Sequence, residues 1–174
     1  MKLRLTSMLL AGLLLVMATP VLAEPTPEEV IAAIEKLGGK VKVGGSKSVV
    51  GVNLIGTEVS DAGLVHLKGL NSLEKLELAS SKVSDAGLVH LKGLTKLEQL
   101  HLYGTGISDA GLVHLKGLTK LKQLHLNYIK VAGVGLVHLE PLANLKELVL
   151  FDTKISDAGL VHLKGLTKLE HLHL

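Results

Sequence analysis

The chain lacks cysteine entirely, and aromatic residues are almost as scarce. Its 174 residues include no Cys and no Trp, one Phe and two Tyr. The absence of Cys excludes disulfide bonds, cysteine zinc sites and thiol catalysis. With 47% hydrophobic but only 2% aromatic residues, a core must be built from Leu and Val. This composition is typical of a regular stacked fold in which one kind of position is filled repeatedly.

Residues 1–23 show the three-part pattern of a secretory signal peptide. Lys2 and Arg4 precede an apolar run over residues 8–18, and Val21 and Ala23 occupy the −3 and −1 positions of a cleavage site. We therefore expect cleavage after Ala23 and a secreted or periplasmic protein. The alternative is an uncleaved anchor. A spanning helix needs about 20 apolar residues and this run is shorter, so we expect no stable membrane span after signal removal.

An excess of charge of one sign is also missing. The chain has 19 basic and 16 acidic residues, and removal of Lys2 and Arg4 leaves 17 lysines against the same 16. Such a balance gives no electrostatic basis for binding nucleic acid or an anionic membrane.

Residues 24–48 differ in character from the rest of the chain. Thr26 and Glu29 are spaced as a capping box, and Pro27 suits the first turn of a helix. Apolar residues then follow with helical spacing, at Val30, Ala33, Ile34 and Leu37. Residues 40–43 alternate like a short strand. We expect this helix and strand to cap the N-terminal end of the region that follows.

An internal repeat fills residues 49–174. The segment SDAGLVHLKGL begins at Ser60, Ser84, Ser108 and Ser156, and a degraded copy, AGVGLVHLEPL, lies in register with them from Ala132 at a period of 24 residues. The other half of each unit fits L-x-x-L-x-L, as in LEKLEL, LEQLHL and LKQLHL. One unit cannot bury its leucines alone, so we expect the units to stack on one another.

This unit resembles a leucine-rich repeat. Its SDAGL element is most similar to the cysteine-containing subtype, although the usual Cys is absent, in a secreted protein of bacterial type. The resemblance covers residues 49–174, about five to six repeats of which the last is incomplete. It implies an α/β solenoid, a right-handed coil with a parallel concave sheet and short helices on its convex side.

The residue pattern within one repeat supports the same architecture. Leu100 and Leu102 alternate with polar residues and should point into the coil. Leucines then recur at every third position, at Leu112, Leu115 and Leu118. This spacing suits a short α- or 3₁₀-helix packed behind the strand. Ser108 and Asp109 fit the N-cap and first turn of that helix, so we interpret the repeated Ser-Asp pairs as helix caps.

Five of the nine histidines occupy one position of the repeat. They are His66, His90, His114, His138 and His162. A column of metal ligands or proton carriers on the convex side is one interpretation. We favour an ordinary, partly exposed repeat position, because adjacent helices pack roughly 10 Å apart, too far to share a ligand.

The outward side chains of the strands differ between repeats while the leucines do not. Variation on one face of a rigid scaffold indicates a specific binding surface, here for a protein or peptide and without catalysis. Tyr103 and Phe151 should lie about 10 Å apart and anchor the partner. The predicted binding residues are Lys75, Glu77, Gln99, His101, Tyr103, Gln123, His125, Asn127, Glu147, Phe151, His171 and His173.

Other chemistry finds little support. His101 and His125 should be neighbours across two strands, with Glu77 beside them, which leaves metal binding as a third hypothesis. However, Val149 interrupts this column before His173. The sequence also has no glycine-rich phosphate loop, nucleophile elbow or HExxH motif, so we expect neither an enzyme nor a cofactor.

One repeat departs from the pattern. A hydroxyl residue stands at the same place in four repeats, at Thr57, Ser81, Thr105 and Thr153. These hydroxyls should bond turn backbone, which Ile129 at the equivalent place cannot do. The segment from Asn127 to Gly135 also loses the Ser-Asp pair. A local kink, a partner contact and sequence drift all remain open explanations.

The sequence stops at Leu174, directly after a strand and before the helix that would complete the repeat. Truncation of a longer protein and coverage of the last coil by another copy both remain open. Our second hypothesis for function is therefore a structural or envelope-associated solenoid that self-associates through this end.

Overall fold

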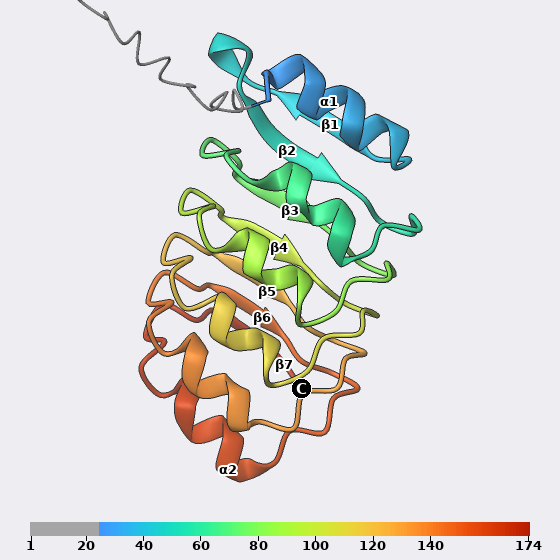
Figure 1. The fold of residues 1–174 in the computed structure, drawn as a ribbon. Coiled ribbons are helices and arrows are strands. Elements are labelled where there is room, and N and C mark those ends of the chain that lie inside the picture. Colours follow the sequence, from blue (N-terminus) through green and yellow to red (C-terminus); the bar gives the residue numbers. More distant parts are fainter. Residues whose placement is uncertain (1–24) are drawn as a thin grey trace, which may run out of the picture.

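The structure, a computed structural model, describes residues 25–174, so the predicted signal peptide lies outside the described residues. The chain winds into a curved stack of coils, with a sheet along one side and short helices along the other (Figure 1). Seven strands form one sheet in sequence order: β1 (Lys40–Val43), β2 (Val49–Asn53), β3 (Lys75–Glu77), β4 (Gln99–His101), β5 (Gln123–His125), β6 (Glu147–Val149) and β7 (His171–His173). The predicted α/β leucine-rich-repeat solenoid is confirmed.

The strands repeat because each coil contributes the same short segment. From β2 to β7 all neighbours are parallel and paired without slippage, so that Leu76, Leu100, Leu124, Leu148 and Leu172 form one row. Side chains one residue away point to the opposite face, because strand side chains alternate. The sheet therefore presents leucines to the interior and the variable residues to the concave side.

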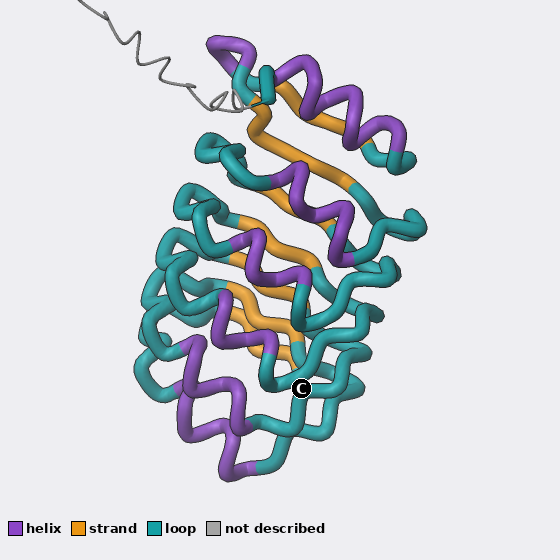
Figure 2. The backbone as a smooth tube through the Cα atoms, viewed as in Figure 1, coloured by secondary structure: helices purple, strands orange, loops and turns teal. Residues whose placement is uncertain are grey.

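The helical side is built mostly from 3₁₀ turns. One 3₁₀ turn, η1 (Gly45–Lys47), joins β1 to β2. Those of the helical side are η2 (Asp61–Leu67), η3 (Gly87–Leu91), η4 (Gly111–His114), η5 (Val134–Leu139) and η6 (Val161–Leu163), with α2 (Asp157–Leu160) as a single α-helical turn. Figure 2 shows these segments stacked opposite the sheet, with loops joining the two sides. The leucine spacing of three residues explains the 3₁₀ form, which has three residues per turn.

Leucine fills the space between sheet and helices. Leu88, Leu91, Leu94, Leu97 and Leu100 of one repeat are almost fully buried, and the equivalent residues of the central coils are buried with them in one continuous core. Each fully buried leucine stabilises the fold by about 1.5–3 kcal/mol relative to an exposed one. The core thus depends on stacking, since every leucine row is completed by the coils before and after it.

An α-helix and an antiparallel strand cover the N-terminal end of this core. Helix α1 (Pro27–Lys36) follows a capping box in which the Thr26 N–H donates to Glu29 Oε2 at 2.8 Å and the Glu29 N–H donates to Thr26 Oγ1 at 3.3 Å. Its Val30 and Ile34 are buried against the first coil. Strand β1 pairs antiparallel with β2. None of the helices within residues 25–174 is long and apolar enough to cross a membrane.

The prediction that the Ser-Asp pairs are helix caps holds for position but not for most of the bonding. Ser60 and Ser156 stand at the N-caps of η2 and α2 without a capping hydrogen bond, while Ser108 Oγ accepts from the Ala110 N–H at 3.3 Å. The Ser108 N–H and Oγ–H donate to the Asp85 carboxylate of the preceding coil at 2.8 and 2.6 Å. Ser84 donates to Asp61 in the same way. Asp61 with Ser84 and Asp85 with Ser108 therefore join neighbouring coils. The glycine of SDAGL makes room for this contact, because a Cβ on Gly111 would collide with the Asp85 carboxylate.

The hydroxyl residues at the turn after each strand behave as predicted. Thr57, Ser81, Thr105 and Thr153 each donate to the carbonyl oxygen three residues earlier, at 2.5–2.9 Å. The residue before this position has a left-handed backbone in all five coils, including the one with Ile129, with φ between 54° and 66° at Gly56, Ser80, Gly104, Tyr128 and Asp152. One turn geometry thus recurs in five coils, although only two of them have glycine there.

Candidate binding surface

Two rows of side chains cross the concave face of the sheet. The strand register aligns Lys75, Gln99, Gln123, Glu147 and His171 in the first row, and Glu77, His101, His125, Val149 and His173 in the second. Most members are half-buried, whereas His171 and His173 are exposed. The structure therefore brings together the strand residues that the sequence predicted for this face.

Four members of these rows form a contiguous cluster, which we call the His-Glu cluster: Glu77, His101, His125 and Glu147. The two imidazole rings stack with centroids 4.2 Å apart and planes 6° from parallel. His101 Nδ1 lies 3.5 Å from Glu77 Oε1, and His125 Nε2 lies 3.0 Å from Glu147 Oε1. Gln123 donates to the other oxygen of Glu147 at 3.0 Å.

The surroundings of His101 favour its neutral form. Burial lowers its pKa below the usual 6.5, and the neighbouring His125 lowers it further, while Glu77 acts in the opposite direction. Its Nε2 atom is buried and has no hydrogen-bond partner. The ring therefore has no onward partner for a proton relay, and it offers the neighbouring coil a flat, uncharged surface.

The stacked geometry does not suit a shared metal ion. Imidazole lone pairs lie in the ring plane, and two parallel rings stacked face to face do not direct them at one point. Over residues 25–174, no three His, Asp or Glu side chains are close enough together to hold a metal ion. The cluster can instead offer carboxylate acceptors and ring faces to a partner's side chains.

A shallow hollow lies on the concave side near the N-terminal cap. It has a volume of about 440 Å³, and its lining includes Lys42 of β1, Asn53 of β2, Lys75 of β3 and Gln99 of β4. Farther along the same face, Lys122 pairs with Glu98 at 2.7 Å. Acidic and basic side chains thus both line the hollow and the rows beside it.

The residues after the strands depart from the prediction. Asn127, expected to point outward, is buried, with only 6% of its surface exposed. Phe151 packs edge-on against Tyr128, with ring centroids 5.0 Å apart and planes at 86°. We had expected Tyr103 to share an anchor with Phe151 and had missed Tyr128. A signal was present, since Tyr128 occupies a turn position held elsewhere by Gly, Ser or Asp.

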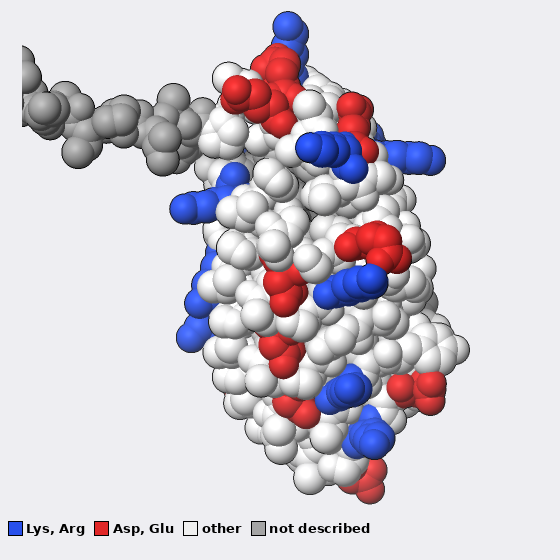
Figure 3. Space-filling model, turned by 45° about the vertical axis from the view of Figure 1, so that its right-hand side comes forward, with Lys and Arg blue, Asp and Glu red and all other residues white. Residues whose placement is uncertain are grey.

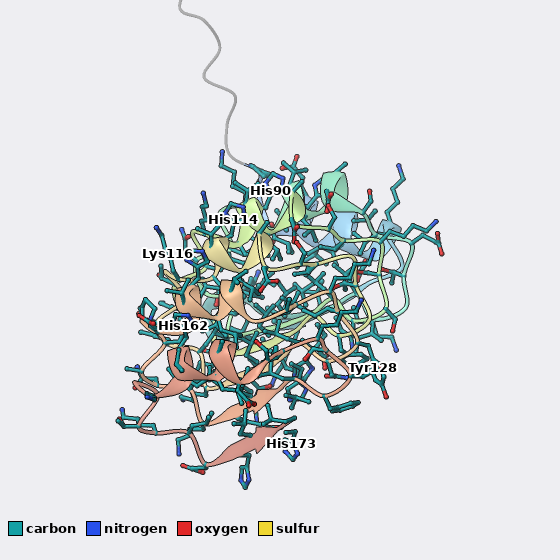
Figure 4. All side chains as sticks on the ribbon, turned by 90° about the horizontal axis from the view of Figure 1, so that it is seen from below. His90, His114, Lys116, Tyr128, His162 and His173 are labelled. Carbon is teal, nitrogen blue, oxygen red and sulfur yellow. The ribbon has the colours of Figure 1, made fainter. Side chains whose placement is uncertain are left out.

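The convex histidines form no comparable cluster. Figure 4 shows His90, His114 and His162 on the helical side, with Tyr128 and His173 elsewhere on the molecule. His162 Nδ1 lies 2.8 Å from Glu140 Oε1, whereas His114 Nδ1 is buried without a partner. On the face drawn in Figure 3, acidic and basic side chains are interspersed, with no large patch of one sign.

Comparison with known proteins agrees with the fold. The profile of the Leucine Rich repeat family matches residues 69–91 and 142–163. The chain is built of leucine-rich repeats. The repeats superpose on an internalin, InlF, from Listeria monocytogenes, with a TM-score of 0.61 and 24% identity over 84% of this chain and 41% of that one. The chain therefore spans less than half the length of this structure.

A second internalin of the same bacterium, internalin C2, matches these leucine-rich repeats with a TM-score of 0.45 and 20% identity, over 87% of this chain and 98% of that one. No curated protein sequence is significantly similar to the chain. The likeness to InlF concerns the fold alone. The cysteine-containing subtype remains a resemblance of the SDAGL element.

Proposed function

We propose that the chain is a non-catalytic binding module of an exported protein and that it holds a protein or peptide against the concave face of its sheet. The observation that carries this proposal is the pair of side-chain rows across β3 to β7. From β3 to β7 the first row contains Lys, Gln, Glu and His and the second contains Glu, His and Val, with β4 and β5 alike, while the position between the rows is leucine in all five strands. Such a surface can be specific without any change to the scaffold.

The rigidity of the rows supports the proposal. Their strands are paired on both sides from β3 to β6, and the leucines beneath them are fully buried. Contacts within the rows, such as the stacked His101 and His125, hold the side chains in place before a partner arrives. Side chains ordered in advance lose less conformational entropy on binding, which favours affinity.

The absence of catalysis is part of the same proposal. Two of the repeated serines, Ser84 and Ser108, donate their hydroxyls to aspartates of the preceding coil and so serve the contact between coils. His101 contacts a carboxylate on one side only, and its other ring nitrogen is buried without a partner. This arrangement serves packing and recognition better than proton transfer.

Site-specific photo-cross-linking tests the proposal. A photoreactive residue replaces Gln99, on the concave face, or in a matched control Lys116, which is exposed on the helical side. After illumination in an extract of the producing cells, we expect a discrete cross-linked protein with the concave probe and none with the convex probe. Equal products from both positions would refute concave binding. A product that contains only a second copy of the chain would favour the self-association hypothesis instead.

A further inference from the structure

The turn at Tyr128 is the one place where the repeat puts a large side chain on a left-handed residue. Tyr128 has φ 58°, in the column where Gly56 and Gly104 have φ 66° and 65°. A bulky residue in this conformation is an outlier and costs roughly 1–2 kcal/mol. Such strain is found mainly where a function requires the side chain.

The next residue, Ile129, is buried in the core but does not close the turn with a hydrogen bond. In four coils a hydroxyl at this place closes the turn, as Thr105 does by donating to the Leu102 carbonyl at 2.6 Å. Ile129 occupies the place in this coil and has no donor, so the equivalent carbonyl of Leu126 receives no such bond. The turn therefore combines backbone strain with a missing hydrogen bond. Burial stabilises Ile129, but it does not explain the exposed tyrosine at position 128.

What the turn does provide is an exposed aromatic pair. Tyr128 and Phe151 meet edge-on with centroids 5.0 Å apart, and 55% and 37% of their surfaces remain exposed. They are two of only three Phe, Tyr and Trp residues in the chain. Two perpendicular rings form a corner that can hold one apolar side chain, and Tyr is enriched among the residues that dominate binding energy.

Lysines flank this corner. Lys130 and Lys154 follow the two rings by two and three residues in neighbouring coils, and both are exposed. Lys82, in the same column two coils earlier, pairs with Glu58. Lys130 and Lys154 form no ion pair within the part of the chain that the structure describes. Among residues 127–131 and 149–155, which form the two turns, Asp152 is the single carboxylate, so the two turns together carry a net positive charge.

We propose that the aromatic corner, formed by Tyr128 and Phe151 with Lys130 and Lys154, binds a protein segment that carries an apolar side chain between carboxylates. The site lies at the edge where the strands end, beyond the two rows of the concave face, and does not depend on what those rows bind. A protein segment fits better than an anionic lipid surface, because such surfaces are bound by clusters of about four to eight basic residues and this corner has two lysines.

Nuclear magnetic resonance offers a direct test, since the three aromatic residues give separate ring signals. The probes are short synthetic peptides with a central Leu, Phe, Trp or Met between glutamates, and controls with lysines in place of the glutamates. We expect acidic peptides to shift the Tyr128 and Phe151 signals with Kd values of about 1 mM or tighter, and lysine peptides to bind at least about tenfold more weakly.

Two sets of variants sharpen the test. Tyr128→Gly, which copies Gly104 and relieves the backbone, should weaken acidic-peptide binding at least about tenfold in a fully folded protein. Lys130→Glu with Lys154→Glu should reverse the preference between the two peptide series, whereas Lys116→Glu on the helical side should not change it. The proposal would be overturned by failure of every acidic peptide, by equal binding of both series, by shifts caused by phosphatidylserine vesicles instead of peptides, or by shifts that follow protein concentration alone.

Discussion

Asp85 and Gly133 occupy the same position of the repeat two coils apart, and they join the next coil in different ways. Asp85 accepts two hydrogen bonds from Ser108. Asp109, at the same position in the coil between these two, accepts three hydrogen bonds from the backbone N–H groups of Ala132, Gly133 and Gly135. Gly133 has no side chain to offer, and its backbone lies directly against Gly159 instead.

The coils nevertheless stack in the same register on both sides of this change. Strands β5, β6 and β7 pair as the earlier strands do, and the leucine row continues through Leu124 and Leu148. The leucines therefore set the period, while the hydrogen bonds accepted by Asp61, Asp85 and Asp109 are an additional connection that the junction after Gly133 lacks. The coil without this connection is also the one with the strained turn and the exposed Tyr128, so the departures from the repeat gather in one place.

Removal of the Asp-Ser connection gives the largest effect that we predict. Asp85→Ala leaves the half-buried Ser108 N–H and hydroxyl without their acceptor, and should lower the free energy of unfolding by about 1.5–3 kcal/mol. The matched change Asp157→Ala lies in an identical SDAGL segment, but Asp157 is exposed, so we expect less than about 0.5 kcal/mol. Urea unfolding at neutral pH measures both. If both variants lose the same free energy of unfolding, the hydrogen bonds between Asp85 and Ser108 do not contribute to stability.

A smaller effect should appear as a pH dependence of stability. The pKa of His101 is lowered below 6.5, first by burial and then by His125, so the folded chain binds fewer protons at this ring than the unfolded chain does. The stability that His101 contributes is fully present above pH 6.5 and is lost as the pH falls through the lowered pKa. Glu77 and Glu147 oppose this effect and Lys75 adds to it.

Urea midpoints at about pH 7.5 and pH 5 measure this dependence. His101→Gln should reduce the loss of stability between the two conditions. His114→Gln provides a comparison on the helical side, where burial also lowers the histidine pKa. We expect a larger reduction from His101→Gln, because a second histidine is stacked on that ring. If the two midpoints of His101→Gln differ as much as those of the unchanged protein, His101 is not a source of the pH dependence.

The sequence was sufficient to predict whatever repeats within a single coil. The leucine rows, the 3₁₀ turns, the turn hydroxyls and the capping box at Thr26 all follow from local spacing. The concave rows followed too, since the strand period and the 24-residue register place His101 beside His125. Stacking of their rings at 4.2 Å could not be foreseen, because it depends on side-chain rotamers.

Contacts between coils were misjudged where a local explanation seemed sufficient. Ser and Asp at a helix start satisfy every rule for caps, so their partners 23 residues away remained hidden until the coils were stacked. Asn127 was expected to point outward by strand alternation, but it lies beyond the end of β5, where that alternation no longer applies. Phe151 likewise lies beyond the end of β6, so strand alternation did not predict its contact with Tyr128.

The last and smallest effect isolates the strained turn. At position 128 a glycine should be more stable than an alanine by about 1 kcal/mol, because only glycine adopts a positive φ without cost, and both changes remove the same ring. At Tyr103, whose φ is not positive, the order should reverse, with glycine less stable than alanine by about 0.5–1 kcal/mol. Thermal or urea unfolding of the four variants gives both differences. A glycine that destabilises at both positions would show that Tyr128 is not strained, and the turn would then be as ordinary as those of its neighbours.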